Sequence, residues 1–286
     1  MKKLHLTRFA AVATVALMGS TAAWGAEGTG WSTGGTTLTL KSIADPGSVS
    51  ISSDDANSIN NAGIKTIVVD RGAASATYST LMLPATVKPS ESQQIVAAYY
   101  PTGYNPSITT LDMQSTDEIQ ANKPYLVEVS GLPTTFEFNK ASSNYTVEAT
   151  GSVTHSFTLS SSCWEFTGTY ASQNWASADN LYGYDAKDGV FVKASSATIY
   201  PMRAYLTCSQ AQFVNGLGKV AASEPLPDVI NVRFLDKDGG TLSIGKMNTR
   251  TGDIQMQDRY YDLKGRKLNG KPQNKIMYVN KKVIKH

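Results

Sequence analysis

Histidine, the usual general base of a hydrolytic site, is scarce in this chain. His5 lies in the N-terminal segment and His286 ends the chain, so His155 stands alone between Thr154 and Ser156. A Ser-His-Asp site would need His155 as its base, yet no Gly-x-Ser-x-Gly motif marks a nucleophile. We therefore expect His155 to be a solvated strand residue and the protein not to be an enzyme.

Pairs of carboxylates are the second chemical candidate, because glycoside hydrolysis needs only two acids held several ångströms apart. The adjacent pairs are Asp54-Asp55 and Asp117-Glu118, and both lie in polar stretches. Such surroundings keep carboxylates hydrated and do not favour acid catalysis. Acids from distant parts of the chain could still meet in a groove, so a β-fold glycoside hydrolase remains one alternative.

Metal ligation has one candidate segment, the acidic turn at 236–239. Its sequence, Asp-Lys-Asp-Gly, resembles the start of a calcium loop, in which oxygen ligands alternate around the ion. The EF-hand pattern also requires glycine at the sixth position and glutamate at the twelfth, where this chain has Thr241 and Met247. We predict a hairpin turn here, and we expect no metal site and no cofactor.

Aromatic side chains provide the best binding hypothesis, since flat rings stack on the faces of sugars. Two groups of three flank predicted turns and form the candidate glycan-binding set, which is Tyr99, Tyr100, Tyr104, Trp175, Tyr182 and Tyr184. The competing interpretation is that the sheets bury these rings. Trp164 and Phe166 share one face of a predicted strand, and we assign both to the core.

The elements that must position these residues are predicted to be strands. Apolar and polar residues alternate with period two over 125–129, 136–138, 230–234 and 254–256, and Thr37–Leu40 has the composition of a strand. Such alternation is typical of antiparallel strands with one buried face. A short helix is expected at Ser90–Tyr100, between a capping serine and Pro101.

Turn residues separate these strands at short intervals. The turn sequences are Asp188-Gly189, Asn215-Gly216, Asp238-Gly239-Gly240 and Asn269-Gly270. Many short strands with such turns predict an all-β fold, and we expect an antiparallel β-sandwich body.

Two cysteines, Cys163 and Cys208, make a disulfide plausible in an exported chain. Both lie beside strand-like segments, 164–166 and 203–206, which could be neighbours in a sheet. Two separately buried thiols are the alternative.

The first 25 residues have the three parts of a secretory signal peptide. Basic residues precede an apolar run over 9–18, and small residues around Gly25 predict cleavage before Ala26. The run is shorter than the roughly 20 residues that span a bilayer. Because this segment holds three of the 26 basic residues and no acid, the remainder has 23 basic and 23 acidic residues. A neutral chain does not favour nucleic-acid binding.

A composition break divides the rest of the chain. Residues 216–228 (GLGKVAASEPLPD) combine small residues with two prolines, as linkers do. Residues 259–286 hold nine lysines and arginines against Asp262 alone. We predict a β-sandwich body over 26–215, a linker over 216–228 and a small β domain over 229–286, whose lysines deter edge-to-edge strand pairing.

Two short motifs near the C-terminus carry a family resemblance. They are Tyr261-Asp262-Leu263-Lys264-Gly265-Arg266 and Lys281-Lys282-Val283-Ile284. In combination they resemble the C-terminal sorting domains of type IX secretion substrates in Bacteroidetes-type bacteria. The resemblance implies a small Ig-like β-sandwich that carries these residues as its sorting motif. Ile276-Met277 stands where that family usually has a glycine before the tyrosine, and the Pro-Asn-Pro that often opens such domains is missing.

Four segments of the body also resemble proteins that carry such a tail. These segments are Tyr78–Pro84, Lys123–Val127, Trp164–Tyr170 and Pro201–Leu206. The resemblance implies a location for the protein and no particular activity.

These observations predict a non-catalytic β protein, exported to the cell surface or released from the cell, that acts as a structural or interaction module. Its expected partners are the secretion machinery and an extracellular glycan or protein, with association to the outer-membrane surface allowed and nucleic acid excluded. The first alternative is a carbohydrate-binding or adhesion module, which needs exposed rings. The second is the glycoside hydrolase, which needs converging carboxylates.

Overall fold

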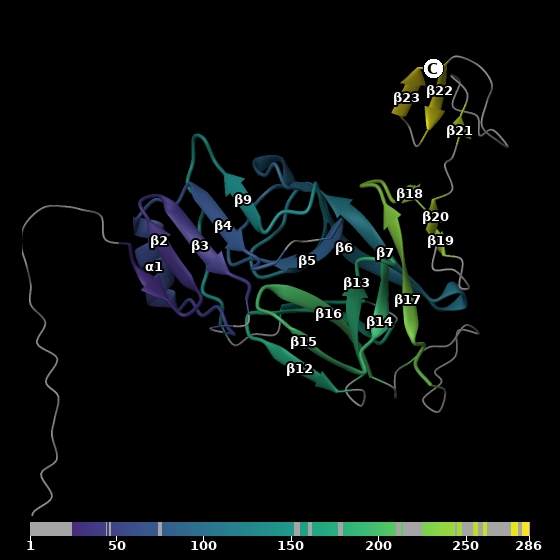
Figure 1. Ribbon diagram of the computed structural model, residues 1–286, viewed down its shortest axis with the longest axis horizontal. Coiled ribbons are helices and arrows are strands. Elements are labelled where there is room, and N and C mark those ends of the chain that lie inside the picture. The colour runs from purple at the N-terminus through teal and green to yellow at the C-terminus, as the bar shows by residue number, and fades with distance from the viewer. Residues whose placement is uncertain are drawn as a thin grey trace, which may run out of the picture.

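The structure is a computed structural model of the 286-residue chain. It describes residues 25–43, 45, 47–73, 76–151, 155–159, 162–176, 180–209, 213 and 225–243, with short strands within 245–285. The predicted signal peptide, apart from Gly25, lies outside the described residues, as does most of the predicted linker. The described part is mostly strand (Figure 1), which confirms the all-β class.

The first sheet is formed mainly by the N-terminal part of the chain and has the order β1-β2-β3-β4-β9 (Figure 1). Its strands are β1 (Glu27–Gly28), β2 (Trp31–Gly34), β3 (Thr37–Lys41), β4 (Thr66–Asp70) and β9 (Thr135–Asn139). β3 contains the strand predicted at 37–40. β3 and β4 run parallel, which departs from the antiparallel expectation. Parallel neighbours need a crossover connection, and helix α1 (Ser53–Asn61) lies in it.

The polar sequence of α1 does not reveal a helix by its periodicity, but its first residues carry a capping signal. Ser52 Oγ accepts from the Asp55 N–H at 3.1 Å, and the Asp55 carboxylate accepts from the Ser52 N–H at 3.0 Å. Hydrogen bonds from the Ser52 hydroxyl and N–H lower the pKa of Asp55. Ala56 and Ile59 form the buried face. The pair Asp54-Asp55 therefore belongs to a helix start.

The second sheet is larger and follows the order β10-β11-β16-β13-β14-β17-β7-β6-β8-β5, with β18 paired to β17. Its strands are β5 (Tyr78–Met82), β6 (Ile95–Asn105), β7 (Thr110–Thr116), β8 (Pro124–Val129), β10 (His155–Thr158), β11 (Trp164–Thr169), β13 (Leu181–Asp185), β14 (Val190–Lys193), β16 (Arg203–Cys208), β17 (Val229–Leu235) and β18 (Thr241–Ser243). Two 3-10 turns, η1 (Pro89–Glu91) and η2 (Pro106–Ile108), precede β6 and β7. β12 (Gln173–Ala176) and β15 (Ser196–Ile199) form a small separate sheet. β7 and β17 run parallel, a second departure from the antiparallel expectation.

The second sheet curls until β5, at one end of its strand order, reaches β16. The Met82 N–H donates to the Met202 carbonyl oxygen at 3.1 Å, and the Ala204 N–H donates to Thr80 Oγ1 at 3.0 Å. Gly168 on β11 permits this close approach, since a Cβ at that position would overlap Met82 Sδ. The curled sheet therefore encloses a core of its own.

Strand β8 lies between two cores and contributes to both. Tyr125 and Val127 pack in the core shared with the first sheet, together with Phe136 and Phe138 of β9. Leu126 packs inside the curled sheet. Tyr125, Val127 and Val129 are thus buried on one face as predicted, but the prediction that the opposite face meets water is wrong, because Leu126 on that face is buried inside the curled sheet. The alternation predicted for 136–138 is confirmed, since Phe136 and Phe138 are buried and Glu137 is exposed.

The helix predicted at Ser90–Tyr100 is also wrong, because only η1 and the long strand β6 occupy this region. Ser92 Oγ accepts from the N–H groups of Gln94 and Ile95 at 3.2 and 3.3 Å, which turns the chain into β6. Val96 is 58% exposed beside the buried Ile95. Pairing with β7 on one edge and β8 on the other outweighs the helix propensity of this segment.

Strand β17 completes the curled sheet, although the sequence places it in the C-terminal unit. It is hydrogen-bonded to β14 on one edge and to β7 on the other. Ile230 and Phe234 are buried, and half-buried Val232 packs in the same core, so the alternation predicted at 230–234 is confirmed. The start of a separate unit at residue 229 is therefore a misplaced boundary.

The remaining strands follow residue 243. β19 (Gly245–Met247) pairs with β20 (Ile254–Met256), which confirms the strand predicted at 254–256. β21 (Tyr260–Tyr261), β22 (Ile276–Val279) and β23 (Lys282–Lys285) form a three-stranded antiparallel sheet. Tyr261 lies on β21, and Lys282, Val283 and Ile284 lie on β23. The other residues of the predicted sorting motif lie outside the described part of the chain, and they are Asp262, Leu263, Gly265, Arg266 and Lys281.

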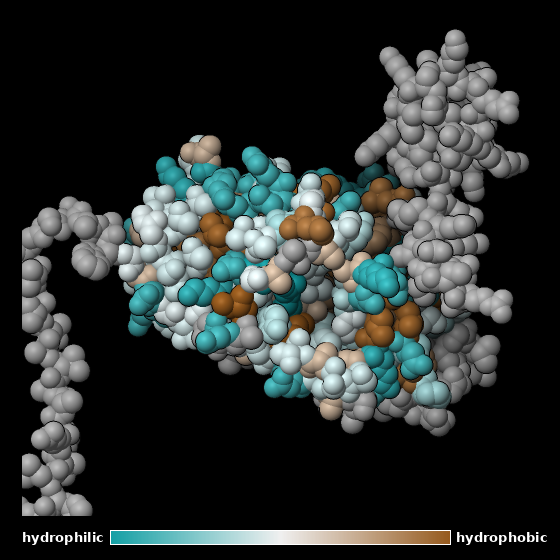
Figure 2. All heavy atoms as spheres, viewed as in Figure 1, coloured by the Kyte–Doolittle hydropathy of each residue, from teal (hydrophilic) through white to brown (hydrophobic). Residues whose placement is uncertain are grey.

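The face seen in Figure 2 carries separate small hydrophobic areas among hydrophilic ones. The large apolar residues that are exposed in the described part are Val96, Ile108, Leu132, Tyr200 and Leu242. Within the described residues, no helix has both the length and the apolar character that crossing a bilayer requires.

Candidate functional site

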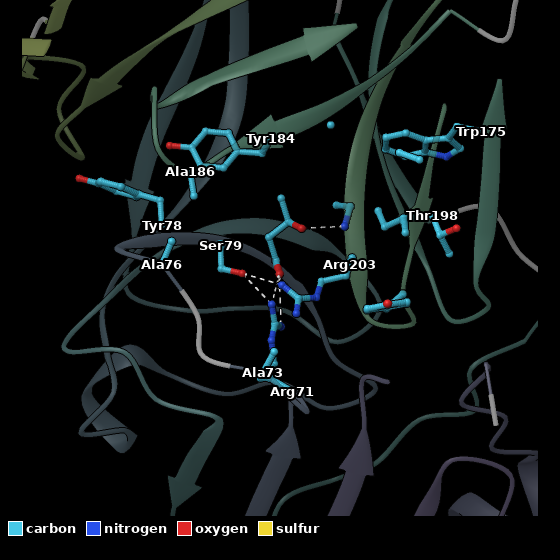
Figure 3. Close-up of a pocket in the computed structure, with 16 residues that line it drawn as sticks. Arg71, Ala73, Ala76, Tyr78, Ser79, Trp175, Tyr184, Ala186, Thr198 and Arg203 are labelled. Carbon is cyan, nitrogen blue, oxygen red and sulfur yellow. Dashed lines mark hydrogen bonds between the residues drawn. The ribbon is translucent and has the colours of Figure 1, made fainter. Parts of the chain in front are cut away.

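One pocket lies where the first sheet, the curled sheet and the small β12–β15 sheet meet (Figure 3). Its volume is about 380 Å³, and its walls come from the segment after β4 and from β5, β12, β13, β15 and β16. We name it the arginine pocket, and the lining residues that matter here are Arg71, Tyr78, Ser79, Trp175, Tyr184, Tyr200 and Arg203.

Arg71 follows β4 and is only 2% exposed. Its Nη2 donates to Ser79 Oγ at 2.6 Å, and both Nη atoms donate to the Thr80 carbonyl oxygen at 3.4 Å. The guanidinium carbon also lies 4.7 Å from the centroid of the Phe136 ring, a cation–π contact. The Nε of Arg71 is buried and has no hydrogen-bond partner among the described residues. This cation is therefore held by neutral groups.

Arg203 opens β16 and reaches the same serine from the curled sheet (Figure 3). Its Nη1 donates to Ser79 Oγ at 2.9 Å, so one hydroxyl oxygen accepts from two guanidinium groups. The Nε of Arg203 is buried without a partner in the described part of the chain. Burial lowers the pKa of Arg203 to about 10, because its positive charge is desolvated and not neutralised.

No carboxylate lines the arginine pocket among the described residues. The acids nearest in sequence, Asp70 and Asp185, each accept a backbone N–H of their own turn at 2.9 Å. The ion pairs found within the described ranges involve Arg233 and Lys237 instead. Two neighbouring cations without a counter-charge repel each other, and burying a charge without a partner is unfavourable.

Tyrosine rings form much of the remaining wall. Tyr184 packs edge-on against Phe191 with the ring centroids 5.2 Å apart, and its buried hydroxyl has no partner among the described residues. Tyr78 stacks on Phe234 at 5.0 Å, and burial raises the pKa of Tyr78 to about 12, so its hydroxyl stays protonated at neutral pH. Tyr200 is 40% exposed and offers a ring accessible from solvent.

These groups are hydrogen-bond donors and aromatic rings, which are suited to holding a ligand. The partners of the Ser79 hydroxyl are two guanidiniums, which remain protonated and cannot act as a general base. Among its described lining residues the pocket has no histidine, cysteine, aspartate or glutamate. Two cations and several rings can instead hold a ligand that has both a negative group and a flat face.

No family model, curated protein or solved structure matches this chain. The interpretation of the pocket therefore depends on its own geometry, and the resemblance to type IX secretion substrates stays a prediction.

The six predicted glycan-binding rings are not together. Trp175 and Tyr184 both line the arginine pocket. Trp175 is nonetheless only 7% exposed, and Tyr184 packs against the inner core. The other four also pack in or against the cores: Tyr99 is 5% and Tyr182 0% exposed, and Tyr100 and Tyr104 pack as half-buried side chains. The Tyr182 hydroxyl donates to the Pro227 carbonyl oxygen at 2.7 Å, and the Tyr99 hydroxyl donates to Glu128 at 3.3 Å. Each of these two rings packs among apolar side chains while its hydroxyl keeps a hydrogen-bond partner.

Other sequence candidates are placed as follows. Asp117 forms an ion pair with Lys237. The other predicted acidic pair, Asp54-Asp55, lies in the first turn of α1. His155 lies on β10, and its side chain is outside what the structure describes. Asp236 accepts from two backbone N–H groups of its turn at 3.0 and 2.6 Å, which confirms the hairpin predicted between β17 and β18.

The predicted disulfide is present. Cys163 and Cys208 are bonded, and their Cα atoms lie 4.8 Å apart. Their strands pair as expected, with Trp164 opposite Cys208 and Phe166 opposite Leu206. Trp164 and Phe166 are fully buried, which confirms their assignment to the core.

Sequence reasoning missed the residues that define the pocket, above all Arg71, Ser79 and Arg203. Arg71 and Arg203 stand 132 positions apart, and no local motif surrounds either of them. The only available signal is that each arginine interrupts or adjoins an apolar strand, where a charge needs a partner.

Proposed function

We propose that this protein is an exported β protein without catalytic activity and that it acts as a binding module through the arginine pocket. The observation that carries the proposal is the convergence of two guanidiniums and several tyrosines on one pocket whose described lining offers no general base. A site of this kind holds a ligand and does not transform it.

Export is proposed from both ends of the chain. The N-terminal pattern has the parts of a signal peptide, and the Cys163–Cys208 disulfide favours an oxidising compartment. We propose that the chain after residue 243 is a small Ig-like sorting domain that engages a type IX secretion machinery. The body would then be displayed on the outer-membrane surface or released.

Intact mass measured on protein recovered from its own cells tests the export proposal. We expect a chain that begins at Ala26, is sensitive to protease added outside the cells, and is cut or modified after Ser243. The cut is expected beyond Ser243 because β17 and β18 belong to the curled sheet. A full-length, protease-protected chain with an unmodified His286 would contradict this proposal.

Carbohydrate binding is the second candidate function, and the exposed ring of Tyr200 in the arginine pocket favours it over the structural role alone. Tyr200 is its most accessible ring. Because the ring is exposed, Tyr200→Ala should preserve folding. We expect this variant to bind its saccharide at least about fivefold more weakly, which corresponds to about 1 kcal/mol of ring contact.

An array of neutral and acidic oligosaccharides, followed by calorimetric titration of any that bind, makes this measurement. Leu132→Ala is the matched control, because it removes an exposed apolar side chain that lies outside the pocket lining. Equal binding by the Tyr200→Ala variant and the unmodified chain would place the saccharide elsewhere.

A further inference from the structure

We propose that the ligand of the arginine pocket is an acidic saccharide, whose carboxylate binds the guanidinium of Arg203 within the positive potential of Arg71. This inference builds on the proposed binding function and names the chemical class of the ligand. Its starting observation is that Ser79 Oγ is the shared acceptor of both guanidiniums, at 2.6 and 2.9 Å.

The charges of the pocket are unbalanced. Both arginines stay positive at neutral pH, and no acid lines the pocket among its described residues. A single hydroxyl oxygen is a weak partner for two cations, since it carries no charge to offset their repulsion. A carboxylate would supply the missing charge, and its two oxygens match the forked geometry of guanidinium donors.

Donors remain available for such a group. A guanidinium has five N–H donors, and Arg203 uses one of them in its bond to Ser79. Arg203 is only partly buried, whereas Arg71 is covered. We therefore infer that the ligand contacts Arg203 directly and that Arg71 contributes only its positive electrostatic potential.

The walls suit a sugar ring better than a bare oxyanion. Tyr78 and Tyr184 both line the pocket, and the Tyr184 hydroxyl is without a partner in the described residues, whereas the Tyr78 hydroxyl interacts with Glu128. A volume of about 380 Å³ exceeds what a carboxylate, sulfate or phosphate alone would fill. Tyr200 lines the same pocket with a ring that is 40% exposed and can face a pyranose.

Calorimetric titration of the mature, disulfide-bonded chain with D-glucuronate and D-glucose, at equal ionic strength, tests the inference. These two sugars differ at C6, where glucuronate has the carboxylate. We expect glucuronate to bind at least tenfold more tightly, and Arg203→Gln to abolish that preference. Arg203→Lys should keep part of that preference, because lysine keeps the positive charge but lacks the forked N–H donors of a guanidinium.

Arg233→Gln is the matched control, since Arg233 is paired with Asp112 and does not line the pocket. Melting temperatures of all variants separate loss of binding from loss of folding. Glucose binding as tightly as glucuronate, in a manner that depends on Tyr200, would overturn the acidic assignment and leave the proposed binding function standing. Inorganic phosphate or sulfate binding as tightly as glucuronate would overturn the saccharide assignment. Binding of none of these probes or of the oligosaccharide array would count against both proposals.

Discussion

Replacing both Cys163 and Cys208 by serine should lower the free energy of unfolding by about 4 kcal/mol. The bond closes a loop with a sequence separation of 45, and a loop of that size restricts the unfolded chain by about this amount. The loop contains β12, β13 and β15, which carry Trp175 and Tyr184 of the arginine pocket. Loss of the bond should therefore also weaken ligand binding.

Guanidinium chloride unfolding of the oxidised chain, the reduced chain and the double variant makes the comparison. The reduced chain and the double variant should unfold at similar, lower denaturant concentrations. Reductant should leave the unfolding midpoint of the double variant unchanged, which serves as the internal control. Equal stability of all three forms would show that the bond does not restrict the unfolded state.

A chain that ends at residue 215, the end of the body predicted from sequence, should fail to fold. That cut removes β17 and with it the buried Leu226, Ile230 and Phe234 of the inner core. It also leaves β7 and β14 without their shared neighbour. Each large buried side chain contributes about 2 to 5 kcal/mol, whereas a whole domain is stable by about 5 to 15 kcal/mol.

A chain over 26–243 is the matched comparison, because it retains β17 and β18. We expect it to give a cooperative thermal transition and dispersed NMR amide signals, while the chain over 26–215 gives neither. Two folded fragments would show that residues 229–235 are dispensable and that the boundary predicted from sequence is adequate.

The strands could be predicted where one face meets water. Phe136 and Phe138 alternate with polar residues, as do Ile230, Val232 and Phe234, and both segments are strands. Strand order could not be predicted, because alternation does not identify a neighbour. The parallel pairing of β7 with β17 joins segments about 120 residues apart, so nothing local reveals it. The same limitation led to the boundary at residue 229.

The site was less predictable than the fold. Trp175 and Tyr184 could be chosen because aromatic residues are conspicuous, but Tyr99 and Tyr182 are equally aromatic and belong to the core. Burial does not separate the two groups, since Trp175 is 7% and Tyr99 5% exposed. Only the tertiary arrangement brings Trp175 and Tyr184 to the pocket. Arg71 acquires its importance only because β5 and β16 bring Ser79 and Arg203 to it.

Strand β8 has a consequence for how the body unfolds. Because Tyr125 and Val127 belong to one core and Leu126 to the other, displacing this strand would disrupt both cores at once. We therefore expect the first sheet and the curled sheet to unfold as one cooperative unit, although each has its own interior. The arginine pocket takes residues from both sheets, so we expect its two cations to keep their spacing until the whole body unfolds.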